Sequence, residues 1–215
     1  MTNIASSLRM FVPQSYRASD PEAIISHHAF GQIVTAYNGM PYATSVPMYL
    51  EDGPMGERIL FGHMARDNPQ AATLMSGMKA LATFHGPNTY ISASWYKDQP
   101  TVPTWNYVAA QVRGTLTPID DDEKQLAIMR KTIDRSEART GTSWLMKDAP
   151  AGKIDSLLPR IRSFQITVER IDGVTKLSQK HPPADRERVI AALEALPGVA
   201  EAQIAALMRN LGNED

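Results

Sequence analysis

The stretch "FGQIVTAYNGMPYATSVPMYL", residues 30–50, carries the clearest structural signal in the chain. Apolar, β-branched and aromatic residues recur on both sides of Asn38-Gly39, a dipeptide typical of a two-residue hairpin turn. The stretch therefore predicts two antiparallel strands joined by a tight turn. After the Gly/Pro-rich "EDGPMGE", the segment "RILFGHMA" (58–65) predicts a third strand.

Later segments continue the same pattern. We expect two strands about the turn signal "HGPN" in 79–96, a long strand at 104–119 and a further strand at 162–179. Roughly seven strands joined by short turns, with helices at the edges, favour an antiparallel β-barrel in a mainly β (α+β) fold. We expect a single domain over 1–215, with a helical C-terminal extension from about 184 to 215.

Helix signals lie between and after these strands. Asp20 before Pro21 is typical of a helix start, and Asn68 before Pro69 predicts a second, short helix that Gly77 would end. After the aspartates at 120–122, the spacing of apolar residues becomes that of a helix. "LPG" (196–198) divides the C-terminal region into two short helices.

Composition excludes several functional classes. The net charge is −1, which gives no global electrostatic case for nucleic acid or an anionic membrane as the main partner. The chain has no cysteine, so a thiolate nucleophile and a disulfide are excluded. No apolar run is long enough to span a membrane, and we expect a cytoplasmic protein.

The segment "FGHMARDNPQ" (61–70) is the most informative for function. A strand ends there and a helix begins near Asn68, so free backbone N–H groups and the Arg66 guanidinium could attract a phosphate. His63 would lie at the mouth of such a site. The alternative is that Asn68 only caps the helix and that Arg66 is a solvated surface residue.

Polar aromatic residues gather in the next region. They suit a planar heteroaromatic ligand, a subunit interface or ordinary core packing. The residues are Tyr90, Trp95, Tyr96, Trp105 and Tyr107. "KLSQKHPPADR" (176–186) could add basic contacts to an anion, or could be a solvated loop before a helix.

Other kinds of site are disfavoured. No histidine and carboxylate cluster has metal-ligand spacing, so we expect no metal, and no G-x-S-x-G elbow, P-loop or Rossmann glycine pattern occurs. The last helix, within "VAEAQIAALMRN" (199–210), is mostly apolar with one arginine at its end. It predicts packing rather than reading of DNA bases.

Taken in order, these motifs resemble the PaiB-type FMN-binding regulators. "FGHMARDNPQ", "FHGPNTYISASWY", "VPTWNYVAAQVRG" and "GVTKLSQ" carry the resemblance, which spans about residues 11–195. It implies a flavin-reductase-like split β-barrel, a homodimer, and FMN held in clefts between subunits.

The resemblance also implies roles for residues of this sequence. His63 and Met64 would lie near the flavin ring, while Ala65, Arg66 and Asn68 would approach its phosphate. The neighbours of that phosphate or of the ribityl chain would be Thr44 and Ser45. The second subunit would contribute Trp105 and Asn106, with Lys176 as a further candidate.

Three functions follow as hypotheses. The first is an FMN-binding negative transcriptional regulator, in which direct DNA binding rests on the family name and not on charge or motif. The second is a flavin-dependent oxidoreductase using FMN at the dimer interface. The third is a haem-handling split-barrel protein, for which His63, His85 and His181 are the candidate iron ligands.

Overall fold

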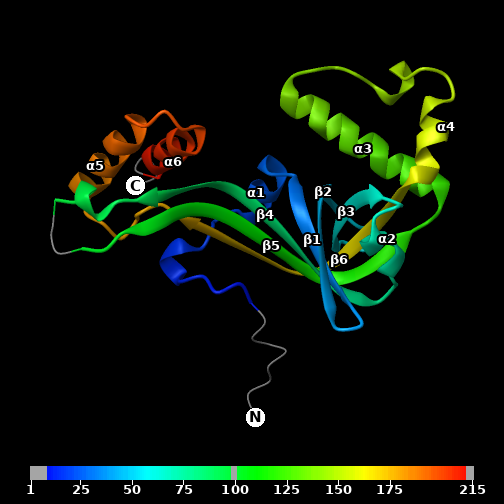
Figure 1. The fold of residues 1–215 in the computed structure, drawn as a ribbon, viewed down its shortest axis with the longest axis horizontal. Helices are drawn as coiled ribbons and strands as arrows, with labels where there is room; N and C mark the ends of the chain where they lie inside the picture. Colours follow the sequence, from blue (N-terminus) through cyan, green and yellow to red (C-terminus); the bar gives the residue numbers. More distant parts are fainter. Residues whose placement is uncertain (1–8, 98–100, 212–215) are drawn as a thin grey trace, which may run out of the picture. The chain divides into compact units, whose positions relative to one another are not determined.

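A computed structural model describes residues 9–97 and 101–211 of the chain, so the two ends of the expected domain lie outside it. Within this range six strands and six α-helices follow one another (Figure 1). The strands are β1 (Phe30–Tyr37), β2 (Met40–Asp52), β3 (Arg58–Ala65), β4 (Met78–Ile91), β5 (Thr104–Ile119) and β6 (Ile161–Lys176). The helices are α1 (Pro21–His27), α2 (Pro69–Thr73), α3 (Asp122–Thr140), α4 (Lys153–Leu157), α5 (Pro183–Glu194) and α6 (Val199–Asn210). Four 3₁₀ turns complete the set: η2 (Gln14–Tyr16), η3 (Ala93–Trp95), η4 (Met146–Asp148) and η5 (Leu158–Arg160).

Backbone contacts divide the chain into two compact units. The first, here called the barrel unit, comprises Ile25–Phe84 and Gln111–Ile171. The second, here called the terminal unit, comprises Met1–Ile24, His85–Ala110 and Asp172–Asp215. Because β4, β5 and β6 each contribute residues to both units, the two are described in turn.

The strands close into a barrel in the order β1-β2-β3-β6-β5-β4. β1 and β2 form the expected hairpin, in which Tyr37 pairs with Met40 across Asn38 and Gly39. Both turn residues have positive φ, 50° and 77°, as a two-residue turn of this kind requires. The antiparallel barrel with peripheral helices expected from the sequence is thus confirmed.

The expected turn at "HGPN" is wrong. β4 runs without interruption from Met78 to Ile91, so the described chain has six strands rather than about seven. None of residues 85–88 has a positive φ, and the fixed φ of proline is compatible with extended backbone. A further difference is that α2 ends at Thr73, four residues before Gly77.

Side chains that point inward from alternate positions of the strands form the core of the barrel unit. Fully buried examples are Ile33 on β1, Leu60 on β3 and Phe164 on β6. On the other face of β2 and β3, Tyr49 stacks on Phe61 with ring centroids 5.6 Å apart. These two rings and Ile128 of α3 form a smaller apolar cluster.

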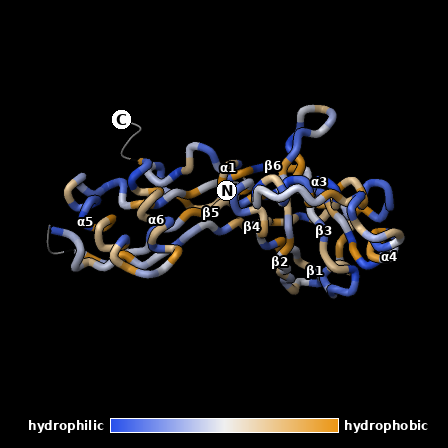
Figure 2. Tube along the Cα trace, turned by 90° about the horizontal axis from the view of Figure 1, so that it is seen from above, coloured by the Kyte–Doolittle hydropathy of each residue, from blue (hydrophilic) through white to orange (hydrophobic). Residues whose placement is uncertain are grey.

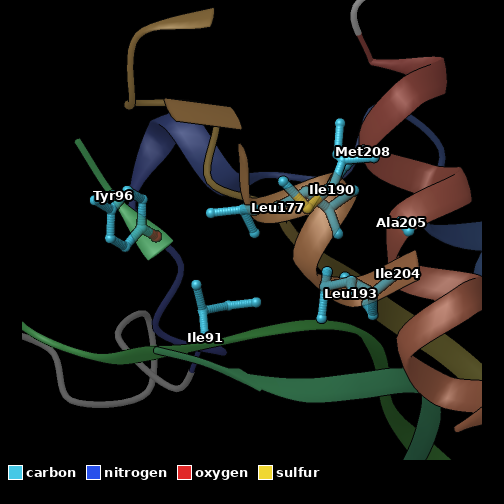
Figure 3. Packing of buried hydrophobic residues seen from close by; sticks show 9 residues of the cluster. Ile91, Tyr96, Leu177, Ile190, Leu193, Ile204, Ala205 and Met208 are labelled. Atoms are coloured by element: carbon cyan, nitrogen blue, oxygen red, sulfur yellow. The ribbon is translucent and has the colours of Figure 1, made fainter. Parts of the chain in front are cut away.

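The C-terminal helices pack within the terminal unit. α5 and α6 bury an apolar cluster that includes Ile91 of β4 and Leu177, just after β6 (Figure 3). Apolar residues, in orange, recur along α6 and the neighbouring part of β5 (Figure 2). The apolar residues of α6 are therefore used in packing, and Arg209 at its end pairs with Glu194 of α5 at 2.8 Å.

Candidate functional site

A buried amide network ties the start of α2 to the hairpin strands. The Thr44 hydroxyl donates to Gln70 Oε1 at 2.6 Å, and Asn68 Nδ2 donates to the same hydroxyl at 3.0 Å. Gln70 Nε2 in turn donates to Thr35 Oγ1 at 2.9 Å, and the Gln70 backbone N–H donates to Asn68 Oδ1 at 2.9 Å. Thr44 and Asn68, both expected at a phosphate, thus hold the turn between β3 and α2 in place.

Ser45 lies on the opposite face of β2. Thr44 pairs with the buried Ile33 of β1, whereas Ser45 pairs with the exposed Gln32. Because successive side chains of a strand point to opposite faces, the Thr44 and Ser45 side chains cannot line one pocket together.

β3 separates its expected site residues in the same way. Met64 is 3% exposed in the barrel interior, and His63 lies on the other face, paired with Ser163 of β6. Within the described part of the chain, His63 Nδ1 and Ser163 Oγ are buried without a hydrogen-bond partner. Burial lowers the pKa of His63, which favours its neutral ring. This cross-strand pair therefore has unused hydrogen-bonding capacity.

Arg66 lies at the exposed end of β3, next to Ala65. Its Nε donates to the Pro159 carbonyl at 2.9 Å, and its Nη1 lies 3.6 Å from Asp120 Oδ1. Asp120 is held more firmly by Arg162, whose Nε and Nη2 each donate to one carboxylate oxygen at 3.0 Å. That bidentate bond, with Arg66 as a smaller contributor, lowers the pKa of Asp120.

Sequence reasoning missed Gln70, Asp120 and Arg162. Gln70 lies two residues after the cap Asn68, one short of the capping-box position, so it carried no local signal. Arg162 carried none, because its position follows from the pairing of Met64 with Arg162 between β3 and β6. The pairing register of strands so far apart in the sequence cannot be predicted from local sequence signals.

The terminal unit holds an open pocket of about 330 Å³ around Trp105. Its lining combines aromatic rings, an imidazole and an amide: His85, Gly86, Asn88, Trp105, Tyr107 and Val108. The Trp105 side chain is 54% exposed and meets Tyr90 edge to face, with ring centroids 6.0 Å apart. Such a lining can hold a flat heteroaromatic group and direct hydrogen bonds to its edge.

Asn106 and Lys176 are engaged elsewhere in the terminal unit. Asn106 has no exposed surface, and its Nδ2 donates to Ser178 Oγ at 3.0 Å. Lys176 donates to Thr104 Oγ1 and lies 5.8 Å from the centre of the Tyr16 ring. Trp105 alone of these three expected residues lines the pocket.

The expected residues thus fall in both units. Those of β2, β3 and the following turn, Thr44, Ser45, His63, Met64, Ala65, Arg66 and Asn68, belong to the barrel unit, and Trp105, Asn106 and Lys176 belong to the terminal unit. The candidate iron ligands also fall in both units. His63 is partly buried in the barrel unit, whereas His85 lines the pocket of the terminal unit and His181 stacks on Tyr96 there.

Within residues 9–97 and 101–211, no group of three or more histidine or acidic side chains could hold a metal ion. No helix within them is both long enough and apolar enough to cross a membrane.

Comparison with known proteins adds independent information. Residues 10–170 match the model of the family described as "Putative FMN-binding domain". The chain is 32% identical over 206 residues to the protease synthase and sporulation protein PAI 2 of Bacillus subtilis (strain 168), covering 94% of this chain and 97% of that protein.

Solved structures resemble this one in fold. The flavocytochrome Anf3 from Azotobacter vinelandii aligns with a TM-score of 0.58 at 12% identity, covering 89% of this chain and 81% of that one. The FAD and haem binding protein from Mycobacterium smegmatis aligns with a TM-score of 0.56 at 14% identity, covering 82% of this chain and 80% of that one. At such low identity these structures show the shared fold alone.

Proposed function

The chain belongs to the family of the "Putative FMN-binding domain", and from that premise we propose that it binds FMN. The observation that carries the proposal is the pocket around Trp105, whose lining suits a flat, polar-edged ring. Bound FMN would supply electron or hydride transfer at its ring. Trp105 and Tyr107 are the proposed ring contacts, contributed by a second copy of the chain in a homodimer.

Arg66 is the proposed phosphate contact. Its side chain is 41% exposed, and its only ion pair among the described residues is the 3.6 Å contact with Asp120. Asp120 keeps its bidentate bond to Arg162 whether or not Arg66 stays beside it. Arg66 can therefore turn to a phosphate without leaving a carboxylate unpaired, and a guanidinium–phosphate bond is strong.

The remaining barrel-unit residues support that contact. Ala65 is proposed to approach the phosphate through its backbone, Asn68 and Thr44 keep the turn rigid, and Ser45 offers an exposed hydroxyl to the ligand. His63 is the proposed contact for a polar edge of the ligand, because its Nδ1 is buried and has no partner within the described chain. Asn106, which is fully buried, is proposed to hold the strand behind Trp105 rather than to touch the ligand.

For the biological role, we propose a transcriptional regulator like that named for the PaiB-type proteins. Support comes from the identity with the sporulation protein of Bacillus subtilis. The regulation we propose is indirect, since α6 buries Ile204, Ala205 and Met208 within its own unit. The cytoplasmic location expected from the sequence stays a prediction.

One observation favours a second candidate, a flavin-dependent oxidoreductase. His85 and Asn88 are exposed and line the same pocket as Trp105. An imidazole and an amide beside a bound ring could orient a small substrate there and exchange a proton with it.

The test compares FMN with riboflavin, which lacks the phosphate. We expect Arg66→Ala to weaken FMN binding by about 1.5–3 kcal/mol, roughly tenfold or more in Kd, and to leave riboflavin binding unchanged. Trp105→Ala should weaken both ligands. Fluorescence titration measures the affinities, and sedimentation with and without FMN measures the oligomeric state.

Matched controls exist for both variants. Arg130→Ala removes an exposed arginine of α3, and Trp144→Ala removes a tryptophan that is 41% exposed in the barrel unit. Neither should change the affinity for FMN. An Arg66→Ala variant that binds FMN as tightly as the wild type would refute the phosphate assignment, and a Trp105→Ala variant with normal riboflavin binding would refute the ring assignment.

A further inference from the structure

The segment Lys176–His181, here called the basic loop, contains a strained residue. Ser178 has φ 61°, a conformation that non-glycine residues other than asparagine and aspartate seldom adopt. It is also 3% exposed, so the strain is enclosed by neighbouring structure. Such strain persists only where the surroundings impose it, and it concentrates at functional positions.

Side chains of the terminal unit impose this conformation. Asn106 Nδ2 donates to Ser178 Oγ at 3.0 Å, and the Tyr96 hydroxyl lies 3.4 Å from the same oxygen. Leu177 lies among the residues of the apolar cluster to which α5 and α6 contribute, next to Ile190, as Figure 3 shows. The basic loop is therefore anchored at its strained residue and at the residue before it.

Hydrogen bonds within the loop fix the rest of its backbone. The Leu177 N–H donates to Gln179 Oε1 at 2.7 Å, and the His181 N–H donates to the Ser178 carbonyl at 3.0 Å. The His181 ring then stacks on Tyr96, with centroids 4.3 Å apart. The cationic side chains at the two ends of the loop thus project from a rigid base.

Both of these cations gather at one ring. Lys180 Nζ lies 5.3 Å and Lys176 Nζ 5.8 Å from the centre of Tyr16. Tyr16 is brought there by close packing of the N-terminal segment on β6, where the Ala18 N–H donates to the Gly173 carbonyl at 3.1 Å. A methyl group on Gly173 would come within 2.9 Å of the Ala18 Cβ, so glycine permits the approach.

The charge of this cluster is uncompensated within the described chain. Neither Lys176 nor Lys180 has a carboxylate at ion-pair distance there, and Lys176 has only the Thr104 hydroxyl and the Tyr16 ring as partners. Two ammonium groups near one ring, without a carboxylate partner in the described chain, give this part of the loop a positive charge that attracts an anion.

We propose that Lys176, Lys180 and Tyr16, presented by the basic loop, form a binding site for the phosphate group of a small phosphate monoester. Such a group carries close to two negative charges at neutral pH and accepts several hydrogen bonds. Two ammonium groups and the phenol and Thr104 hydroxyls provide matching donors. The site lies wholly within the terminal unit and does not depend on the proposed FMN contacts at Arg66 or Trp105.

Inorganic phosphate is the probe for the test, titrated into the full chain without flavin. Backbone amide shifts measured by NMR should move saturably and be largest for residues 176–181 and Tyr16. The double variant Lys176→Gln/Lys180→Gln should bind phosphate at least about tenfold more weakly, because two charge-assisted contacts are lost. Raised ionic strength should weaken binding to the wild type.

The matched control is Lys147→Gln/Lys153→Gln, which removes two exposed lysines from the barrel unit. It should bind phosphate like the wild type. The proposal is overturned if shifts at 176–181 are absent or no larger than at other exposed lysines, or if the two double variants behave alike. Arg66→Ala should leave the phosphate affinity of the basic loop unchanged. Failure of the basic-loop site can therefore be distinguished from failure of the FMN proposal.

Discussion

Thr44 and Gln70 are joined by a 2.6 Å hydrogen bond that fastens α2 to the hairpin of the barrel unit. Gln70 is 1% exposed, and its amide also donates to Thr35, which is 3% exposed. Buried polar groups of this kind are costly to leave without partners. The bond therefore makes Gln70 a structural requirement for the turn that carries Arg66.

The first prediction concerns this glutamine. Gln70→Leu should lower the free energy of unfolding by about 2–4 kcal/mol, since Thr35 Oγ1 loses its amide donor and the Thr44 hydroxyl loses its acceptor. Urea denaturation measures the change. Gln32→Leu, on the exposed face of β1, is the matched control and should stay within about 0.5 kcal/mol of the wild type.

The second prediction ranks two glycines of the barrel unit. A Cβ on Gly114 would overlap the backbone oxygen of Thr167, which cannot move without shifting β6. A Cβ on Gly62 would come within 2.5 Å of Phe164 Cζ and 2.8 Å of Met48 Cγ, which are side-chain atoms. Gly114→Ala should thus cost about 3 kcal/mol and Gly62→Ala about 1–2 kcal/mol in unfolding free energy.

Gly53→Ala is the control for both, because its methyl would meet only the flexible end of Glu57. Thermal and chemical denaturation of the three variants give the ranking. Equal losses for Gly114→Ala and Gly53→Ala would contradict the close approach of β5 and β6.

The third prediction separates strain from hydrogen bonding at Ser178. Both Ser178→Ala and Ser178→Gly lose the bonds to Asn106 and Tyr96, but only glycine relieves the positive φ. The alanine variant should therefore be less stable than the glycine variant by about 1 kcal/mol.

At Ser94, which is exposed and has no positive φ, the order should be reversed, because glycine there only adds freedom to the unfolded chain. Denaturation midpoints of the four variants decide the matter. The same order at both serines would show that Ser178 is not strained.

The fourth prediction concerns acid stability. The hydrogen bond from Arg162 lowers the pKa of Asp120 in the folded chain. As the pH falls, the Asp120 carboxylate is therefore protonated in the unfolded chain before it is protonated in the folded chain. The contribution of ionised Asp120 to the free energy of unfolding is fully present above about pH 4. It is lost as the pH falls through the lowered pKa of Asp120 in the folded chain. Because the Asp120 side chain is 53% exposed, solvent screening keeps the effect small.

Asp120→Asn should accordingly flatten the loss of stability below about pH 4. Urea midpoints measured across the acid range test this. Asp67→Asn, at an exposed turn position, is the matched control and should follow the wild-type curve. An Asp120→Asn curve parallel to the wild type would contradict the assigned role of Arg162.

Much of the local structure could be predicted because its signals are local. The bounds of β3 and β5 follow from their residues, and Asp20 caps α1 as expected, its Oδ1 accepting from the Ala23 N–H at 2.9 Å. The family resemblance predicted from the ordered motifs is confirmed by the match over residues 10–170. The strand count was wrong at "HGPN", where turn-forming residue types lie in extended backbone.

The candidate site could be predicted only in part, for a physical reason. Turn and cap preferences arise from the φ and ψ energies and side-chain bonds of a few adjacent residues, so the sequence alone identified the hairpin at Asn38-Gly39 and the cap at Asn68. Pairing of His63 with Ser163, and the burial of Gln70, depend on how distant strands and helices pack together. That packing places the Trp105 ring in an open pocket and buries its neighbour Asn106, a distinction that comes from the whole fold and not from either residue.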